Sequence, residues 1–337
     1  MSGVINVEVS EDEADLRLDR WFKRHFPGLP HVQLQKLVRK GHVRVDGKRA
    51  KANTRLESGQ TIRVPPMDVE ASHEKSAKAP NPSHASDEDI ADLHERILYI
   101  DDDVIVLDKP PGLAVQGGTG IKKSIDGMLG VLKFDKNERP KLVHRLDKDT
   151  SGILLLGRTA KAAAKLTEAF RSKTVRKIYW AIVVGCPEYS AGRIDLALSK
   201  LQGQKGERMV PDPEKGKRAL TFYRTIEKAS RKATWLSLEP LTGRTHQLRV
   251  HMEALGVPIL GDGKYGGQES FLQGPGLSRK MHLHARAIRI PHPGGGELEI
   301  VAPMPEHMQA TWKFFGFDQS SGDDPFYLPE GEDYPGR

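Results

Sequence analysis

The segment 142–156 contains the residues best suited to carry chemistry. Asp147 lies there beside three basic residues, His144, Arg145 and Lys148, and an apolar run follows closely. Nearby cations favour the charged form of a carboxylate, and a charged carboxylate can act as a nucleophile or a base without a cofactor. An aspartate in an ordinary turn would give the same pattern, and Asp149 lies two residues further on. The spacing therefore marks a candidate carboxylate without choosing between the two aspartates.

Patterns that would indicate a bound cofactor or metal are incomplete. The segment 261–266 matches G-x-G-x-x-G, but no helical pattern follows it and no acid stands about 20 residues further on, as a dinucleotide site requires. His282 and His284 lack the cysteine pair or carboxylate that completes a zinc site. The single cysteine, Cys186, excludes a disulfide within the chain. We therefore expect no metal, no nucleotide and no other cofactor.

The elements that must position these residues show two periodicities. Apolar runs bounded by turn residues predict strands at 97–100, 104–110, 153–156, 178–184 and 235–238. Helical patterns lie between them, at 160–171 behind a Thr159 N-cap and at 245–255. Strands come as neighbouring pairs as often as they alternate with helices. The predicted fold class is therefore α+β, with a mixed, mostly antiparallel sheet flanked by helices.

Positive charge is concentrated in one short part of the chain. Between Arg17 and Arg63 there are 13 Lys or Arg residues against three acids, whereas all 337 residues together carry a net charge of +7. Helical spacing of apolar residues at 16–24 and 32–40 precedes a hairpin pattern with an Asp46-Gly47 turn. Two helices and a hairpin rich in cations favour a small nucleic-acid-binding domain. A basic, solvated surface without a ligand would show the same pattern.

This basic segment resembles the S4 RNA-binding domain, most clearly in the run from Arg39 to Lys48. The resemblance covers about 50 residues and implies an RNA ligand. Phosphate contacts position RNA without reading its sequence, so exposed cations are the expected contacts. Those expected here are Lys36, Arg39, Lys40, Arg44 and Lys48.

Four later segments resemble the pseudouridine synthases that modify ribosomal large-subunit RNA. Residues 144–152 are similar to the signature of that family, and residues 176–183 to its Arg-Lys-x-Tyr-x-Ala strand. Residues 241–251 are similar to its third motif, and residues 258–265 to the block that follows. They occur in the family's order, behind an S4-like segment.

Two further stretches bear on specificity within the family. Residues 115–120 and 281–286 look most like synthase C, and a synthase D specificity is the alternative. Outside the family, a non-catalytic S4 RNA-binding or ribosome-assembly factor and a glycosidase acting at C1′ stay open.

The resemblance implies an isomerase that detaches uracil from C1′ of a uridine, turns it, and rejoins it through C5. In this reaction Asp147 would be the essential carboxylate, either attacking C1′ or removing a 2′ proton, and Arg249 its ion-pair partner. Tyr179 would stack on the uracil and accept the proton of C5. From the residues alone, Arg249 could instead contact a phosphate and Tyr179 could be a core residue of its strand, and we favour the ion pair with Asp147 for Arg249.

Other site residues follow from the same resemblance. Arg145 would help to displace the target base from its stack, a step that costs a few kcal/mol. Further contacts with RNA are expected from His144 and Arg244. The implied partner is large-subunit ribosomal RNA. No nucleotide cofactor is needed, because no group is added and no electron is carried.

Composition suggests how the chain is organised. We expect an S4-like domain at 1–66, a flexible linker at 67–92, a catalytic domain at 93–316 and an acidic, disordered tail at 317–337. From Asp318 onward the chain has six acids against one base. No signal sequence or membrane-spanning run is visible, so we expect a cytoplasmic protein with no membrane partner. The family implies a monomer.

Overall fold

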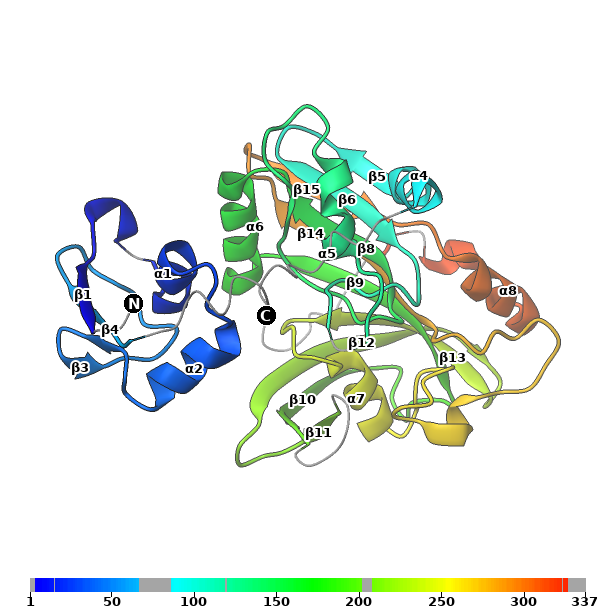
Figure 1. Ribbon diagram of the computed structural model, residues 1–337. Helices are drawn as coiled ribbons and strands as arrows, with labels where there is room; N and C mark the ends of the chain where they lie inside the picture. Colours follow the sequence, from blue (N-terminus) through cyan, green and yellow to red (C-terminus); the bar gives the residue numbers. More distant parts are fainter. Residues whose placement is uncertain are drawn as a thin grey trace. The chain divides into compact units, whose positions relative to one another are not determined.

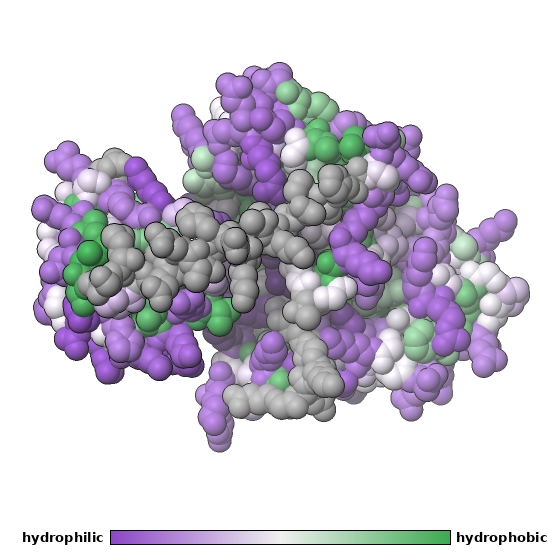
Figure 2. All heavy atoms as spheres, in the orientation of Figure 1, coloured by the Kyte–Doolittle hydropathy of each residue, from purple (hydrophilic) through white to green (hydrophobic). Residues whose placement is uncertain are grey.

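The computed structural model describes residues 4–14, 16–66, 86–118, 120–201, 208–322 and 324–326. Contacts divide the chain into two compact units, Met1–Asn81 and Pro82–Arg337 (Figure 1). In the residues described, no helix is long and apolar enough to cross a membrane. The visible surface is mainly hydrophilic, with hydrophobic residues in small separated patches (Figure 2).

The first unit is a small sheet covered by two helices. Its elements are β1 (Ile5–Glu8), η1 (Glu11–Glu13), α1 (Leu18–His25), α2 (His31–Arg39), β2 (Arg44–Val45), β3 (Lys48–Arg49) and β4 (Thr61–Val64). The strands lie in the order β1-β4-β2-β3 and are all antiparallel. Trp21 and Phe22 of α1 pack with Leu34 of α2 in the core. Asp46 and Gly47 have φ of 48° and 71°, the left-handed turn expected for the hairpin.

The second unit contains the remaining elements. Its strands are β5 (Ile97–Ile100), β6 (Val104–Lys109), β7 (Lys141–Leu142), β8 (Ser151–Gly157), β9 (Arg176–Val184), β10 (Ala191–Lys200), β11 (Met209–Pro211), β12 (Lys217–Ala229), β13 (Ala233–Pro240), β14 (Leu283–Pro291) and β15 (Glu297–Val301). Its helices are α4 (Asp87–Glu95), α5 (Ile125–Met128), η2 (Leu129–Leu132), α6 (Ala160–Ser172), α7 (Gln247–Ala254), η3 (Gly267–Ser270), α8 (Glu306–Phe315) and η4 (Gln319–Gly322).

All the strands of the second unit belong to one 11-stranded sheet. The main order is β11-β10-β12-β13-β9-β14-β8-β6-β5, with β15 paired to β14 and β7 to β8. Among the described strands, β8 and β14 pair in parallel and every other pair is antiparallel. The predicted α+β class with a mixed, mostly antiparallel sheet is confirmed.

Helices α7 and α8 pack against opposite faces of the central strands. Trp312 of α8 contacts Trp180 of β9 in a buried cluster of aromatic side chains. Leu248 of α7 belongs instead to the cluster that contains Ala181 and Tyr179. Since side chains alternate along a strand, Tyr179 lies on the face opposite Trp180, as its spacing predicts.

The end of the expected linker is helical. Helix α4 begins at Asp87, and the Ser86 hydroxyl caps it by accepting the backbone N–H of Asp89 at 3.2 Å. Leu93 near its end is buried in the core, which secures the helix. The prediction of a flexible segment to residue 92 is therefore wrong from residue 86 onward, and residues 67–85 lie outside the described part of the chain.

The beginning of the expected tail is packed against the sheet. Phe317 and Phe326 are buried in the cluster around α8. The guanidinium groups of Arg176 and Arg289 lie 5.2 and 4.4 Å from the centre of the Phe326 ring. Two aromatic side chains thus outweigh the acidic composition, and the expectation of disorder from residue 317 is wrong for these positions. Residues 327–337 lie outside the described residues.

Candidate active site

Asp147 lies in the loop that leads from β7 into β8. The backbone N–H of Thr150 donates to the carbonyl of Asp147 at 3.2 Å, which closes a tight turn. Gly152 follows with a φ of 101°, and a Cβ there would lie 2.3 Å from the carbonyl oxygen of Ala285. Only glycine allows β8 to approach β14 so closely at this point. The turn and the glycine together fix where the Asp147 carboxylate emerges from the sheet.

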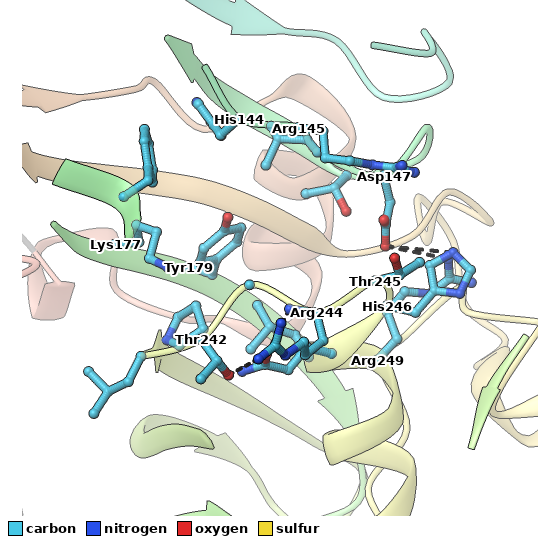
Figure 3. A pocket seen from close by; sticks show the side chains of 18 of the residues that line it. His144, Arg145, Asp147, Lys177, Tyr179, Thr242, Arg244, Thr245, His246 and Arg249 are labelled. Atoms are coloured by element: carbon cyan, nitrogen blue, oxygen red, sulfur yellow. Dashed lines mark hydrogen bonds and ion pairs between the residues drawn. The ribbon is translucent and has the colours of Figure 1, made fainter. Parts of the chain in front are cut away.

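Two hollows, each of about 580 Å³, meet at Asp147. Four residues line both of them: Arg145, Asp147, His246 and Arg249. The first hollow extends over Tyr179 and Lys177 of β9, and the second extends over the loop that contains Lys264 and Asp262. The carboxylate therefore lies on the border that the two cation-rich hollows of the second unit share, and Figure 3 shows the first of them.

Arg249, on the first turn of α7, contacts two carboxylates. Its Nε and Nη2 donate to Asp262 at 2.7 Å each, and its Nη1 lies 3.8 Å from Oδ2 of Asp147. Burial acts to lower the pKa of Arg249, but the hydrogen bonds and charge of Asp262, with the charge of Asp147, hold that pKa above its ordinary value. The expected pairing with Asp147 is present as a loose ion pair, whereas the bidentate partner is Asp262.

His246 also faces Asp147, which the sequence did not reveal. It precedes α7 with a left-handed backbone, φ 53°, and its Nε2 lies 4.0 Å from Oδ2 of Asp147. Burial, followed by the charge of Arg249, lowers the pKa of His246 to about 3, so the ring is neutral at neutral pH. The Tyr265 hydroxyl accepts the N–H of Met209 and lies 2.8 Å from Nδ1 of His246. Its own hydrogen is then available to donate to Nδ1, which acts as the acceptor. We therefore assign the ring proton to Nε2, which faces the carboxylate.

Tyr179 forms part of the floor of the first hollow. Burial, with the negative charge of Asp147, raises the pKa of Tyr179 above its ordinary value. Its hydroxyl makes no hydrogen bond with any residue that the structure describes. The phenol is thus neutral and able to donate a hydrogen bond to a ligand that lies on its ring.

The three residues expected to contact RNA around Asp147 all line the first hollow. His144 accepts the N–H of Leu155 at 2.9 Å, and burial lowers its pKa to about 3. That His144 contacts RNA stays a prediction, and because the ring is uncharged at neutral pH the contact would not be an ion pair. Arg145 and Arg244 are exposed at the rim, and Arg244 donates to the carbonyl of Arg218 at 3.2 Å.

The cations expected on the first unit are all exposed. They lie on α2, directly after it, or on the hairpin: Lys36, Arg39, Lys40, Arg44 and Lys48. The Arg44 guanidinium also donates to the carbonyl of Gly47 at 3.0 Å, which holds it against the turn. Their placement suits phosphate contacts, which stay a prediction.

Lys109, the last residue of β6, is a second residue that sequence reasoning missed. Its side chain is 0 % exposed, and its Nζ donates 2.8 Å hydrogen bonds to the carbonyls of Pro110, Leu113 and Lys148. Burial lowers the pKa of Lys109 to about 7, against the effect of nearby aspartates. Three acceptors match the three N–H groups of an ammonium, so we assign the charged form. A lysine that ends a strand opened by four apolar residues was the available signal.

His282 and His284 have structural contacts in the core. His284 lies 2.9 Å from the Ser151 hydroxyl, and His282 lies 2.8 Å from the Thr311 hydroxyl. Both are fully buried and point to different partners. In the residues that the structure describes, no group of three His, Cys, Asp or Glu side chains could hold a metal ion.

Comparison with known proteins relates this geometry to a family. A family model described as RNA pseudouridylate synthase matches residues 103–254, and a model of the S4 domain matches residues 16–62. A protein of Escherichia coli (strain K12) called ribosomal large subunit pseudouridine synthase C is 38 % identical over 313 residues, which cover 90 % of this chain and 94 % of that protein. The chain belongs to the RNA pseudouridylate synthase family. It is thus an enzyme, a pseudouridine synthase with an N-terminal S4 domain.

Other synthases agree with this assignment. The protein of the same name from Vibrio parahaemolyticus serotype O3:K6 is 37 % identical over 311 residues, with 90 % of this chain and 94 % of that protein covered. The solved structure of human RNA pseudouridylate synthase domain containing 4 is 29 % identical, with a TM-score of 0.58 over 67 % of this chain and 95 % of that chain. The resemblance predicted from the sequence is confirmed, and so is the synthase fold.

Because Lys109 donates a hydrogen bond to the carbonyl of Lys148, we predict that it holds the Asp147 loop in position. We expect Lys109→Met to lower the single-turnover rate about 10-fold and stability by about 1–3 kcal/mol, because buried carbonyls lose their donor. The matched control is Lys161→Met, at an exposed position of α6. Urea unfolding and pseudouridine formation measure the two effects. An unchanged rate in Lys109→Met would show that the Asp147 loop holds its position without this lysine.

Proposed function

We propose that this protein isomerises specific uridines of large-subunit ribosomal RNA to pseudouridine, with Asp147 as the catalytic carboxylate. The observation that carries the proposal is the Asp147 carboxylate, which lies 3.8 Å from the Arg249 guanidinium where two hollows meet. The relatives named ribosomal large subunit pseudouridine synthase C support this choice of RNA and a synthase C type of specificity.

The geometry suits a nucleotide that has left its stack. A base lying on the Tyr179 ring would place its sugar towards Asp147, which either attacks C1′ or removes a 2′ proton. The Arg249 guanidinium supplies the positive charge that a carboxylate in a partly closed site needs to stay ionised. Tyr179 is neutral, so its phenol can accept the proton of C5 only while it passes its own proton on. The reaction rearranges one substrate, and its chemistry calls for no cofactor.

We assign RNA binding to residues 1–66 and catalysis to residues 93–316. The exposed cations of the first unit suit phosphate contacts, and Arg145 and Arg244 at the rim suit the RNA around the target. We further propose that the protein acts as a monomer in the cytoplasm, where an enzyme acting on ribosomal RNA would meet its substrate.

Tritium release tests the proposed function. Pseudouridine formation exchanges the hydrogen on C5, so large-subunit RNA labelled with [5-³H]uridine should release tritium when it is incubated with the purified protein. Small-subunit RNA is the matched control and should release none. Free uracil as the product would indicate a glycosidase, and no release from either RNA would contradict the proposal.

The first unit is expected to contribute affinity and not chemistry. Deleting residues 1–66 should weaken RNA binding more than it slows conversion of bound RNA. In the full chain, replacing Lys36, Arg39 and Lys40 by Gln should reduce the slope of log affinity against log salt by about 2, at about 0.7 for each phosphate that is no longer neutralised. Filter binding at several salt concentrations measures this. An unchanged dissociation constant in the truncated protein would refute the assignment.

A further inference from the structure

The first hollow contains a lysine to which the mechanism above gives no role. Lys177 lies on β9 two residues before Tyr179, so both side chains lie on the same face of the sheet. Both line the hollow that Asp147 borders. In Figure 3, Tyr179 lies between Lys177 and Asp147. A base stacked on the tyrosine would therefore have the carboxylate at one end and the lysine at the other.

The surroundings of Lys177 leave its amine available to a ligand. No residue in the described part of the chain accepts a hydrogen bond from its Nζ. The nearby Glu239 carboxylate accepts two 3.1 Å hydrogen bonds from Arg176 instead. Burial lowers the pKa of Lys177 to about 8, opposed by Glu239, so the amine is mostly charged at neutral pH. A partly desolvated cation without a bonded partner is costly, and such groups usually serve a ligand.

Arg249 is also buried in this hollow, but it is bound to Asp262, and Lys177 lies deeper than the remaining cations. Arg171, Lys173 and Arg244 also line it, but all three are exposed, as expected for contacts with phosphates outside. Lys177 is half-buried beside the stacking ring. Its position therefore favours the base over the RNA backbone.

The reaction creates a negative charge at that position. When the bond between C1′ and N1 breaks, its electron pair stays on N1, and the detached uracil becomes an anion with charge shared by N1, O2 and O4. This anion must stay bound while it turns, although no covalent bond joins it to the sugar. A fixed cation that meets developing charge lowers the barrier more than one that contacts only the neutral substrate.

We propose that Lys177 is a further catalytic residue, which donates a hydrogen bond from Nζ to a carbonyl oxygen of the detached uracil anion and retains that anion while it turns. Lys177 keeps its proton throughout. The electrons that N1 received form the new bond from C5 to C1′. At the same time C1′ loses its bond to Asp147 or, on the other route, C2′ takes its proton back from Asp147. The proton of C5 then leaves to a base, and N1 takes up a proton. The inference rests on the proposed function, since the anion arises only in that reaction.

The rate of the chemical step tests the proposal first. With enzyme in excess over labelled large-subunit RNA, Lys177→Met should convert bound RNA about 100-fold more slowly, the usual effect of losing one group that stabilises developing charge. Its dissociation constant for RNA should change less than about twofold. Lys177→Arg should recover most of the rate, and Lys161→Met should behave as wild type. An unchanged rate, or a loss confined to RNA affinity, would overturn the proposal.

A second measurement needs no conversion of RNA. We would titrate the protein with 5-nitrouracil, a uracil analogue that is anionic at neutral pH, and follow binding by NMR. Wild type and Lys161→Met should bind it, and Lys177→Met at least about tenfold more weakly, as expected when a charge-assisted hydrogen bond is removed. Wild type that fails to bind it, or equal binding by Lys177→Met, would overturn the proposal. If no RNA is converted but binding still depends on Lys177, the proposed function fails while the anion site stands.

Discussion

Asp147→Asn is expected to abolish pseudouridine formation while RNA affinity stays within about twofold of wild type. The amide keeps the shape of the side chain but can neither attack C1′ nor accept a 2′ proton, so a loss of more than about 1,000-fold, or about 4 kcal/mol of barrier, is expected. Single-turnover assays and filter binding separate the two effects.

Asp149→Asn is the informative comparison for Asp147. Residue spacing alone does not distinguish the two aspartates, but in the structure Asp147 is the one that lies beside Arg249 and His246. We expect the Asp149 variant to keep its rate within about tenfold, as for a group that stabilises no developing charge. If Asp149→Asn lost more of the rate than Asp147→Asn, Asp149 and not Asp147 would be the catalytic carboxylate.

Arg249→Met should be the second most damaging change, in both activity and stability. It removes the cation beside Asp147 and leaves the Asp262 side chain, only 1 % exposed, as a buried carboxylate without its partner. Breaking a buried pair in this way costs about 3–5 kcal/mol. We expect the rate to fall at least about 100-fold. Urea unfolding and single-turnover kinetics measure the two losses.

A double variant separates folding from catalysis at this pair. Arg249→Met with Asp262→Asn leaves no unpaired charge at this buried pair, so most of the lost stability should return. The rate should stay low, because Asp147 still lacks its cation. If the double variant recovered activity together with stability, Arg249 would serve the fold alone.

Local patterns predicted those parts of the fold that depend on neighbouring residues. The period-two pattern of β9 correctly separated Tyr179 from Trp180, and the Asp46-Gly47 turn was placed correctly. Strands β10 and β12 were missed, because many of their residues are only half-buried and show no clear apolar alternation. A pattern read along the chain detects such strands poorly, since their pairing partners stabilise them.

The candidate site was predicted as a set of residues but not as a set of contacts. The family resemblance singled out Asp147, Tyr179 and Arg249, which do line one hollow. It gave no sign that Asp262 would be the bidentate partner of Arg249, because that pairing depends on how the loop after α7 folds back. The helix was expected from residue 245, but α7 begins at Gln247, since the preceding residue has a left-handed backbone.

The most direct test of the central claim is a carbodiimide primer-extension map of large-subunit ribosomal RNA from a strain that lacks this gene. We predict that specific pseudouridine stops disappear in the deletion strain, return with the wild-type gene, and stay absent with the Asp147→Asn gene. A map that is unchanged by the deletion, or restored by the Asp147→Asn gene, would contradict the account.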